Sequence, residues 1–401
     1  MFPRFLLHHI LVLGVSASPK HPEWHSYPFH PPGHPVSAKA AYVMSNEPSG
    51  NNIVAMAIAS DGTLSEGRSY STNGNGTNLL NAVTGQPNFP DALASQDSIV
   101  RAGEHLFAVN AGSNSVSMFR INNIDPTKLE LIGEGQDSKG VLPNTLAASE
   151  ELKTVCVANT GTPAGIACAT YSEDGLSAFD DLRTLDVGQS MNPATGPTPG
   201  FADLFFSDNL STLVASVKGN GTEFTGYMAK FAVEEGKVAT VAEKATPPGS
   251  GALFGVTIIP GTDNKIFASD ASLGGFILDL DNLAGQPIAT INVTNQRASC
   301  WAKISRFTGT GFLTDVLVNR LVEVSLEDGT ILDEYYPPNP FQGMADFAVA
   351  GTKLWALSAG NGTFPASITT FDVSGGPKSA RQVSVFAIPG AGVNSMGMVV
   401  G

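Results

Sequence analysis

Residues 107–116, with the sequence FAVNAGSNSV, set the pattern that the rest of the chain repeats. An apolar run ends in Asn110, a Gly-Ser-Asn break follows, and apolar residues return at Val116. Short apolar runs separated by Gly, Asn and Ser are typical of β-strands joined by tight loops. This stretch therefore predicts two neighbouring strands of one sheet.

The run that ends in Asn110 has counterparts along the whole chain. The seven copies are residues 42–46, 107–110, 155–159, 213–217, 266–270, 312–315 and 354–357. Their mean spacing is about 52 residues, and Gly-containing turns such as Asp61-Gly62 and Asp328-Gly329 recur with the same period. No long helical pattern separates the runs. The sequence therefore predicts an all-β fold, a seven-bladed β-propeller with four strands in each blade.

The two ends of the repeat region complement each other. The first repeat, residues 40–72, has three strand-like runs and lacks the inner strand of a blade. Residues 393–399 resemble the inner strand at residues 342–347, and no further strands follow them. We expect this C-terminal strand to join the N-terminal blade and close the ring, which leaves no free inner edge.

Composition argues against two classes of partner. The 401 residues include 22 Lys and Arg against 36 Asp and Glu, a net charge of −14. Nucleic-acid binding needs a positive face, so an acidic chain is not expected to bind nucleic acid. Beyond the N-terminus no apolar run is long enough for a membrane-spanning helix, so no transmembrane segment is expected.

The N-terminal segment indicates export. In residues 1–17, Arg4 precedes an apolar stretch, and Val15-Ser16-Ala17 resembles a cleavage site, as in a secretory signal peptide. Residues 18–38 are rich in proline, which disfavours helix and sheet. This segment is either a flexible leader or a metal-binding arm, and the propeller then occupies residues 39–401. The histidines of the arm would be His21, His25, His30 and His34.

Glycosylation acceptors support an extracellular location. Five Asn-x-Ser/Thr triplets occur in the propeller region. Together with a signal peptide, they are stronger evidence for glycosylation than a single triplet would be. We therefore expect a secreted glycoprotein, with contact to a cell wall or host matrix as one consequence. The acceptors are Asn75, Asn209, Asn220, Asn292 and Asn361.

The chain has three cysteines. Cys156 and Cys168 lie on the second and third strands of one predicted blade, close to facing positions. In an oxidising compartment we expect a disulfide bond between them. Cys300 is left over, and it is either a buried small hydrophobic residue or a reactive thiol.

The same residues carry a family resemblance. Residues 107–116, followed by Met118-Phe119, resemble a blade signature of the lactonase-like β-propeller family, and residues 155–161 resemble a second copy. That family includes 6-phosphogluconolactonases and 3-carboxy-cis,cis-muconate lactonizing enzymes. With its leader and acceptors, the chain resembles the secreted fungal branch known as muconate cyclase-like. The resemblance, which spans the repeat region, implies a propeller that acts on a lactone or a small carboxylate.

Residues that enter the inner strands are expected to ring the mouth of a central channel. Three consecutive blades offer aromatic side chains there, and the opposite side offers amides and one carboxylate, which suits a small-ligand pocket. Alternatively, the aromatic side chains plug the channel as part of the core. The predicted mouth residues are Asp91, Asn144, Phe201, Phe254, Trp301, Gln342 and Asn394.

Carboxylates are the predicted catalytic groups. An apolar cavity can raise the pKa of a carboxylate into the range of a general base. Each candidate could instead end a strand or form a turn, where Asp is common. The candidate carboxylates are Asp91, Asp203, Asp346, Asp270 and Asp315, and the cations that could anchor an anion are Lys303, Arg297 and Arg306.

Other chemistries find little support. His105 is the one histidine of the predicted propeller, and it falls at a turn opposite the mouth. The resemblance implies a catalytic His with Arg and Glu partners in muconate cyclases, and no predicted mouth residue matches that His. Residues 249–255 are glycine-rich but lack the helix that a dinucleotide site needs. We therefore expect no cofactor, and no metal site shows a specific spacing.

Two functional hypotheses remain. The first is an enzyme, an isomerase or hydrolase that opens or closes a lactone ring on a small carboxylate. The second is a non-catalytic extracellular or cell-surface glycoprotein that binds a ligand or matrix. The lack of a histidine at the predicted mouth favours the second hypothesis. With the family resemblance taken into account, we nevertheless expect a lactonase-like protein, and the binding glycoprotein is the alternative.

Overall fold

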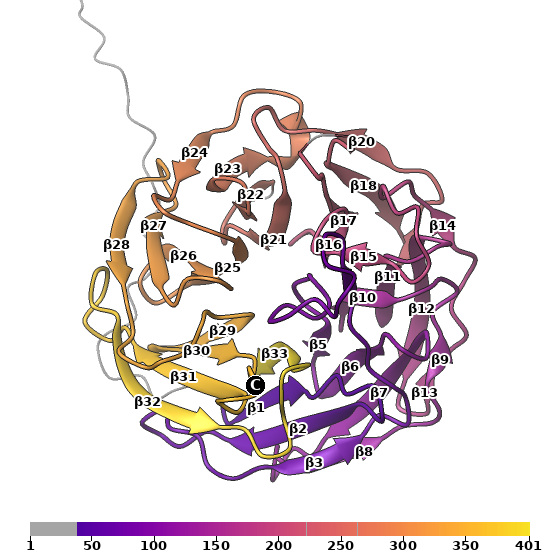
Figure 1. Ribbon diagram of the computed structural model, residues 1–401. Helices are drawn as coiled ribbons and strands as arrows, with labels where there is room; N and C mark the ends of the chain where they lie inside the picture. Colours follow the sequence, from indigo (N-terminus) through magenta and orange to yellow (C-terminus); the bar gives the residue numbers. More distant parts are fainter. Residues whose placement is uncertain (1–37, 222, 263) are drawn as a thin grey trace, which may run out of the picture. The chain divides into compact units, whose positions relative to one another are not determined.

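The computed structural model describes residues 38–221, 223–262 and 264–401. The predicted signal peptide and nearly all of the predicted leader lie outside these residues. Seven sheets surround a common centre (Figure 1), and within each sheet the neighbouring strands are antiparallel. One short 3-10 turn, Leu280–Asn282, is the sole helical element among the described residues. The prediction of an all-β, seven-bladed propeller is confirmed.

Each blade contributes one strand to each of four concentric layers. The innermost strands are β33 (Met396–Val400), β5 (Ile99–Ala102), β10 (Pro143–Ser149), β16 (Gly200–Phe206), β21 (Leu253–Ile258), β25 (Ser299–Ser305) and β29 (Phe347–Ala350). The second strands are β1 (Ala40–Met44), β6 (His105–Asn110), β11 (Thr154–Asn159), β17 (Thr212–Lys218), β22 (Lys265–Asp270), β26 (Thr310–Asp315) and β30 (Lys353–Ser358). The second strands contain the repeated motif, so the predicted register of the repeats is correct.

The outer half of each blade is less regular. The third strands are β2 (Asn52–Ala57), β7 (Ser115–Ile121), β12 (Gly165–Ser172), β18 (Tyr227–Glu234), β23 (Gly274–Asp279), β27 (Leu321–Ser325) and β31 (Ser367–Asp372). The outermost are β3 (Arg68–Ser71), β8 (Leu129–Leu131), β13 (Gly175–Leu176), β19 (Lys237–Val238), β24 (Ala289–Asn292), β28 (Ile331–Tyr335) and β32 (Arg381–Ala387). Three short strands, β9 (Gln136–Asp137), β14 (Arg183–Thr184) and β20 (Glu243–Ala245), extend blades two to four.

The C-terminal strand closes the ring. β33 pairs antiparallel with β1, with Val399 opposite Tyr42. Beyond the ladder, the amides of Lys39 and Ala40 donate to the carbonyl of Gly401 over 2.6 and 2.9 Å. The first blade therefore takes its inner strand from the end of the chain, as predicted.

The second strands form the core because each is enclosed by neighbouring blades. All six residues of β6, and likewise of β11 and β26, are buried. A strand covered on both faces is expected to be nearly continuous in apolar residues, and this explains why these runs dominate the sequence pattern. The largest apolar cluster includes Phe107, Trp301 and Phe347 from three blades.

The polar residue that ends a second strand fastens the neighbouring loop. The carboxylate of Asp270 accepts hydrogen bonds from the amides of Gly251 and Ala252, and from Ser272. The carboxylate of Asp315 accepts from the amides of Arg297 and Ala298 at the equivalent place. At Asp270 and Asp315 the polar residue of the repeated motif is therefore structural, because it binds the backbone that leads into the inner strand of its own blade.

The disulfide forms where it was predicted. Cys156 and Cys168 are direct partners in the pairing of β11 with β12, and their sulfur atoms are bonded. Cys300 is free and buried in the core, with 4% of its surface exposed. Among the described residues, no helix is long and apolar enough to cross a membrane.

Candidate functional site

The centre of the ring is occupied by a loop. We call residues 91–97 the central plug; they belong to the long connection between β3 and β5, and this connection reaches the middle of the ring in Figure 1. Gln96 is fully buried, and its amide nitrogen donates to Asp203 (2.9 Å) and to the carbonyl of Val256 (3.1 Å). Its side-chain oxygen accepts from the amide of Ala302 over 3.1 Å. One glutamine thus links blades four, five and six.

A buried lysine and an asparagine hold the plug from the other side. The ammonium of Lys218 donates to the carbonyl of Ala94 in the plug and to that of Phe201 over 2.6 Å. The side-chain amide of Asn144 also donates to the carbonyl of Phe201 (2.9 Å), and the backbone carbonyl of Asn144 accepts from the Ser95 hydroxyl (2.6 Å). Lys218 lies 4.9 Å from the centre of the Phe254 ring, a cation–π contact. The plug is therefore bonded to four blades in total.

The predicted mouth residues do not line an open pocket. Trp301 and Phe254 pack against each other with ring centres 5.2 Å apart, and both are buried. Phe201 is buried in a separate cluster that includes Cys156 and Leu213. Of the two alternatives that the sequence left open, the structure favours aromatic side chains as core. Asn144, Asp91 and Asn394 are also buried, and Gln342 alone of the seven is exposed.

The side chains of Asp203 and Asp346 accept hydrogen bonds from backbone amides. The inner strands carry bulges in five blades, as between Leu253 and Val256, and a bulge leaves an amide without a partner in the ladder. Asp203 accepts from the amides of Leu204 and Val256, each over 2.8 Å. In this way a carboxylate of blade four caps a bulge of blade five.

Asp346 repeats this arrangement at the ring closure. Its carboxylate accepts from the amide of Phe347 over 2.7 Å and from that of Met398 over 2.8 Å. Met398 lies on β33, next to the bulge between β33 and β1. Asp346 therefore connects blade seven to the C-terminal strand.

Burial changes the proton affinity of these carboxyls. Burial raises the pKa of Asp346 to about 8, with Lys303 opposing the shift. Burial raises the pKa of Asp203 well above its usual value, and Asp97 adds to the shift. Burial raises the pKa of Asp91 to about 7 and lowers that of Lys218 to about 8, and their mutual attraction opposes both shifts.

Lys303 and Asp97 form the one partly exposed ion pair at the centre of the described ring. The ammonium lies 2.7 Å from the Asp97 carboxylate, and the two side chains are 22% and 21% exposed. Burial alone would lower the pKa of Lys303, but Asp97, Asp346 and Asp203 raise it. Lys303 therefore remains a cation, and it and Asp97 are partly exposed while the neighbouring carboxyls Asp203 and Asp346 are fully buried.

The other predicted cations do not join Lys303. Arg297 precedes β25 and Arg306 follows it, so the two lie at opposite ends of a strand that rises about 3.3 Å per residue. Both are exposed. The prediction of a single anion site from Arg297, Lys303 and Arg306 is therefore not supported by their placement.

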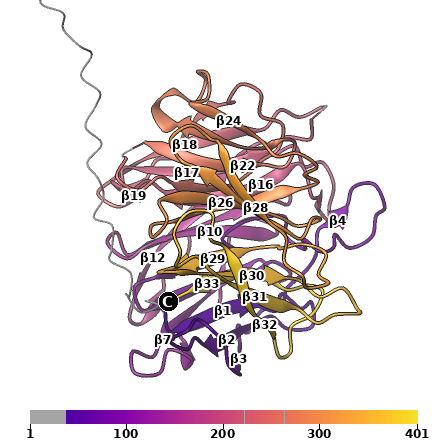
Figure 2. The same cartoon turned by 90° about the vertical axis from the view of Figure 1, so that its left-hand side faces the viewer.

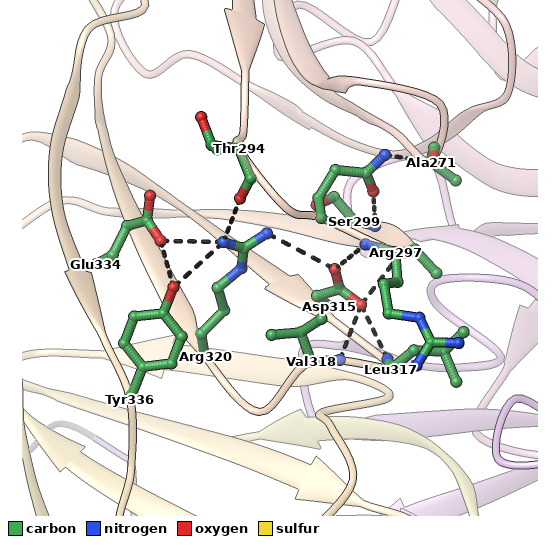
Figure 3. Close-up of polar contacts among 12 residues, drawn as sticks. Ala271, Thr294, Arg297, Ser299, Asp315, Leu317, Val318, Arg320, Glu334 and Tyr336 are labelled. Carbon is green, nitrogen blue, oxygen red and sulfur yellow. Dashed lines mark hydrogen bonds and ion pairs between the residues drawn. The ribbon is translucent and has the colours of Figure 1, made fainter.

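Sequence reasoning missed a buried arginine beside the Asp315 clamp. Figure 3 shows the guanidinium of Arg320 between Asp315 and Glu334. It donates to the carbonyl of Thr294 (2.8 Å) and to Glu334 (3.0 Å), and only 1% of Arg320 is exposed. Arg320 fastens the loop after β26 to the outer strand of its blade. Asp315, one of the predicted catalytic carboxylates, thus has five hydrogen-bond and ion-pair partners that are structural.

Two residues at the centre of the ring differ in how far the sequence could have predicted them. Lys218 ends its second strand where other blades have Asn110, Asn159 or Asp270, so the odd residue was a signal that could have been used. Gln96 gave no such sequence signal, because the connection that contains it has no counterpart in the other repeats.

Among the described residues, neither a catalytic histidine nor a metal-binding group of side chains is evident. His105 begins β6 and is buried, with its Nε2 atom 3.6 Å from the carboxylate of Glu173. Burial lowers the pKa of His105, and Glu173 opposes the shift. Within residues 38–221, 223–262 and 264–401, no three His, Cys, Asp or Glu side chains come together to hold a metal ion.

Comparison with known proteins supports the fold. No protein-family model matches the sequence, and no curated protein matches it. A candidate 6-phosphogluconolactonase from Bacteroides fragilis matches with a TM-score of 0.63 at 15% identity, over 91% of this chain and 98% of that one. A Lactobacillus plantarum protein matches with a TM-score of 0.62 at 11% identity, over 90% and 99% of the two chains.

A third match adds a second candidate of the same description. The candidate 6-phosphogluconolactonase from Bacteroides uniformis has a TM-score of 0.60 at 15% identity, over 88% of this chain and 97% of that one. At such low identity the likeness concerns the fold, and a fold hosts many functions. The chain accordingly has the seven-bladed, lactonase-like propeller fold that these three proteins share.

Proposed function

We propose that this protein is a secreted, N-glycosylated propeller that binds an extracellular ligand or matrix without catalysing a reaction. The observation that carries the proposal is the central plug. Gln96 is fully buried at the centre of the ring, and its side chain is hydrogen-bonded to three blades. A catalytic pocket needs room for a ligand beside its polar groups.

The carboxylates support the same conclusion. Asp203 and Asp346 both direct their oxygens at backbone amides, and neither is exposed. A general base must reach the proton that it removes within hydrogen-bond distance or through one water molecule. These two groups would have to release the bulges of two blades before they could act on a substrate.

Surface features favour export. Asn75, Asn209, Asn292 and Asn361 are exposed, and Asn220 is half-buried. A glycan needs such surface positions. The bond between Cys156 and Cys168 is of the kind that persists in oxidising compartments. Together these features support a secreted glycoprotein.

Two measurements test the proposal on the purified secreted protein. Mass spectrometry before and after N-glycosidase treatment should show mass loss at the exposed acceptors. A panel of lactones and muconates, with 6-phosphogluconolactone included, should show no turnover above the rate without enzyme. Clear turnover by the wild-type protein that the Asp97→Asn change reduces would contradict the non-catalytic function.

A second function, ring opening or closure on a lactone or small carboxylate, is favoured by the Lys303–Asp97 pair. This pair is partly exposed while the surrounding acidic groups are buried. Lys303 would bind the carboxylate of the substrate, and Asp97 would accept a proton as general base. Asp97→Asn should then reduce kcat with little change in KM, whereas Lys303→Met should raise KM.

A further inference from the structure

A polar cavity lies where blades one and two meet. Its volume is about 410 Å³, within the roughly 300–1,000 Å³ of small-ligand sites. β3 of blade one contacts β8 of blade two, and Figure 2 shows β7 of blade two next to β2 and β3 in the lower part of the view. One lining residue follows β3, and the others lie in two turns of blade two. The lining residues are Asn73, Ser113, Asn114, Ser115, Glu134, Gly135 and Asp137.

The lining is suited to a ligand that is rich in hydroxyl groups. Two amides, two hydroxyls and two carboxylates line the cavity, and no Lys, Arg or aromatic side chain is among the lining residues. Within the part of the chain that the structure describes, the carboxylate of Glu134 has no hydrogen-bond or ion-pair partner. Carboxylates accept hydrogen bonds and repel anions, so the cavity favours a neutral polyhydroxyl ligand, a sugar, over a charged one.

The glycosylation acceptor Asn75 is held at the edge of this cavity. Its backbone amide donates to the Ser113 hydroxyl over 3.0 Å, and its carbonyl accepts from the amide of Gly112 over 2.9 Å. Ser113 lines the cavity, and so does Asn73, two residues before the acceptor. The Asn75 side chain is exposed and has no hydrogen bond to any described residue. A glycan on its Nδ2 atom therefore begins beside the cavity.

We propose that the N-glycan of Asn75 folds back into this cavity, where its first sugars bridge blades one and two. The proposal rests on the N-glycosylation proposed above. A short covalent link gives the glycan an effective concentration of about millimolar at the cavity. A sugar from solution lacks this advantage, and an open cavity without aromatic side chains gives it few strong contacts. The linked glycan is therefore the occupant that the cavity favours.

Enzymatic release of glycans from the folded protein tests the proposal. The full chain, secreted from a eukaryotic host, is treated with N-glycosidase, and mass spectrometry follows the loss of glycan at each acceptor. Release at Asn75 should be about fivefold slower than at Asn292, as expected if the glycan spends about four-fifths of its time in the cavity. Asn292 is the matched control, an exposed acceptor at the end of β24 that is not among the lining residues. On tryptic peptides the two rates should be equal.

A change in the lining separates docking from simple crowding at the acceptor. Glu134→Ala removes a hydrogen-bond acceptor from the cavity and leaves the Asn75 sequon intact. Release at Asn75 should then approach the rate at Asn292, and release at Asn292 should stay as in the wild type. Glu134 is exposed, so the melting temperature of this variant should be unchanged.

Hydrogen exchange gives a second measurement that does not depend on the enzyme's access. In the wild-type glycoprotein, amides of residues 112–115 and 134–137 should exchange about three- to tenfold more slowly than after glycan release. Thr77→Ala, which removes the sequon but keeps Asn75, should match the released protein. Asn292→Gln should leave this exchange unchanged.

The outcomes distinguish this inference from the proposed function. Glycans at other acceptors but none at Asn75 would overturn the inference alone, whereas acceptors that all lack glycans would overturn both. Equal release at Asn75 and Asn292, slow release that persists in Glu134→Ala, or exchange that glycan removal does not change would also overturn the inference alone. Protection of Thr77→Ala by free chitobiose at about 10 µM would overturn the linked occupant in favour of a site for sugars from solution.

Discussion

Asp346 and Asp97 are two carboxylates at the centre of one ring, and their surroundings differ in kind. Asp346 is fully buried and accepts hydrogen bonds from two backbone amides. Asp97 is partly exposed and forms an ion pair with the ammonium of Lys303. A buried carboxylate that satisfies amides is part of the scaffold, because its removal leaves donors without partners. A partly exposed ion pair contributes little to stability and remains available to a ligand. A carboxyl group with a shifted pKa at the centre of a propeller is therefore not necessarily a catalytic group.

The strongest test removes the strand that Asp346 holds. Deletion of residues 392–401 takes away β33 and the amide of Met398. We expect loss of the cooperative unfolding transition, or a fall in Tm of about 10 °C or more, measured by calorimetry. A synthetic peptide of residues 392–401 should restore the transition when added in excess, and a scrambled peptide should not. An unchanged Tm after the deletion would refute the closure of the ring.

Replacement of the two carboxylates compares them directly. Asp346→Ala leaves the amides of Phe347 and Met398 buried without acceptors, which should cost about 2–4 kcal/mol in the free energy of unfolding. Asp97→Asn should cost less than about 1 kcal/mol, since its partner Lys303 can turn to water. Urea unfolding followed by tryptophan fluorescence measures both. Equal losses would mean that the two sites do not differ.

Replacement of Lys218 tests how firmly the plug is held. Lys218→Met leaves the carbonyl of Ala94 without its donor, which should cost about 1–2 kcal/mol and speed hydrogen exchange in residues 91–97. The matched control is Lys244, which lies 4.9 Å from the ring of Tyr227 but is exposed. Lys244→Met should leave exchange in the plug unchanged. If the two variants behave alike, Lys218 does not hold the plug.

A pH series tests the shifted pKa of Asp346. Burial raises the pKa of Asp346 from 3.8 to about 8, so between these values the folded chain holds a proton that the unfolded chain releases. This group therefore stabilises the fold at low pH, and its contribution falls as the pH rises from about 4 to 8. Asp346→Asn removes the titration, and the stability should then fall less steeply over this range, by up to about 1.4 kcal/mol per pH unit. Parallel curves for the two proteins, from urea unfolding at several pH values, would contradict the shift.

The sequence predicts the ring because the same local strand pattern occurs in every repeat. Four of the seven second strands end in Asn or Asp, and the first repeat lacks the strand that residues 393–399 supply. The disulfide followed from the facing positions of Cys156 and Cys168. These predictions needed only local patterns that occur several times.

The centre of the ring could not be predicted in the same way. Its content depends on one connection, residues 72–98, that has no counterpart in the other blades and enters the centre only once. Ala92, Leu93 and Ala94 of this connection belong to the same buried apolar cluster as Phe254 and Trp301. The bulges that engage Asp203 and Asp346 were not predicted either, because one extra residue in a short and mostly apolar inner strand produces no distinctive sequence pattern.

The pairing of β33 with β1 has a consequence for biosynthesis. At about 5–20 residues per second, synthesis of this chain takes roughly 20–80 s, and the edge of β1 stays open until the final residues emerge. An open strand edge is a template for wrong pairing with other chains. The first blade therefore stays incomplete until residues 396–400 have been made, and until then the edge of β1 needs protection from other chains.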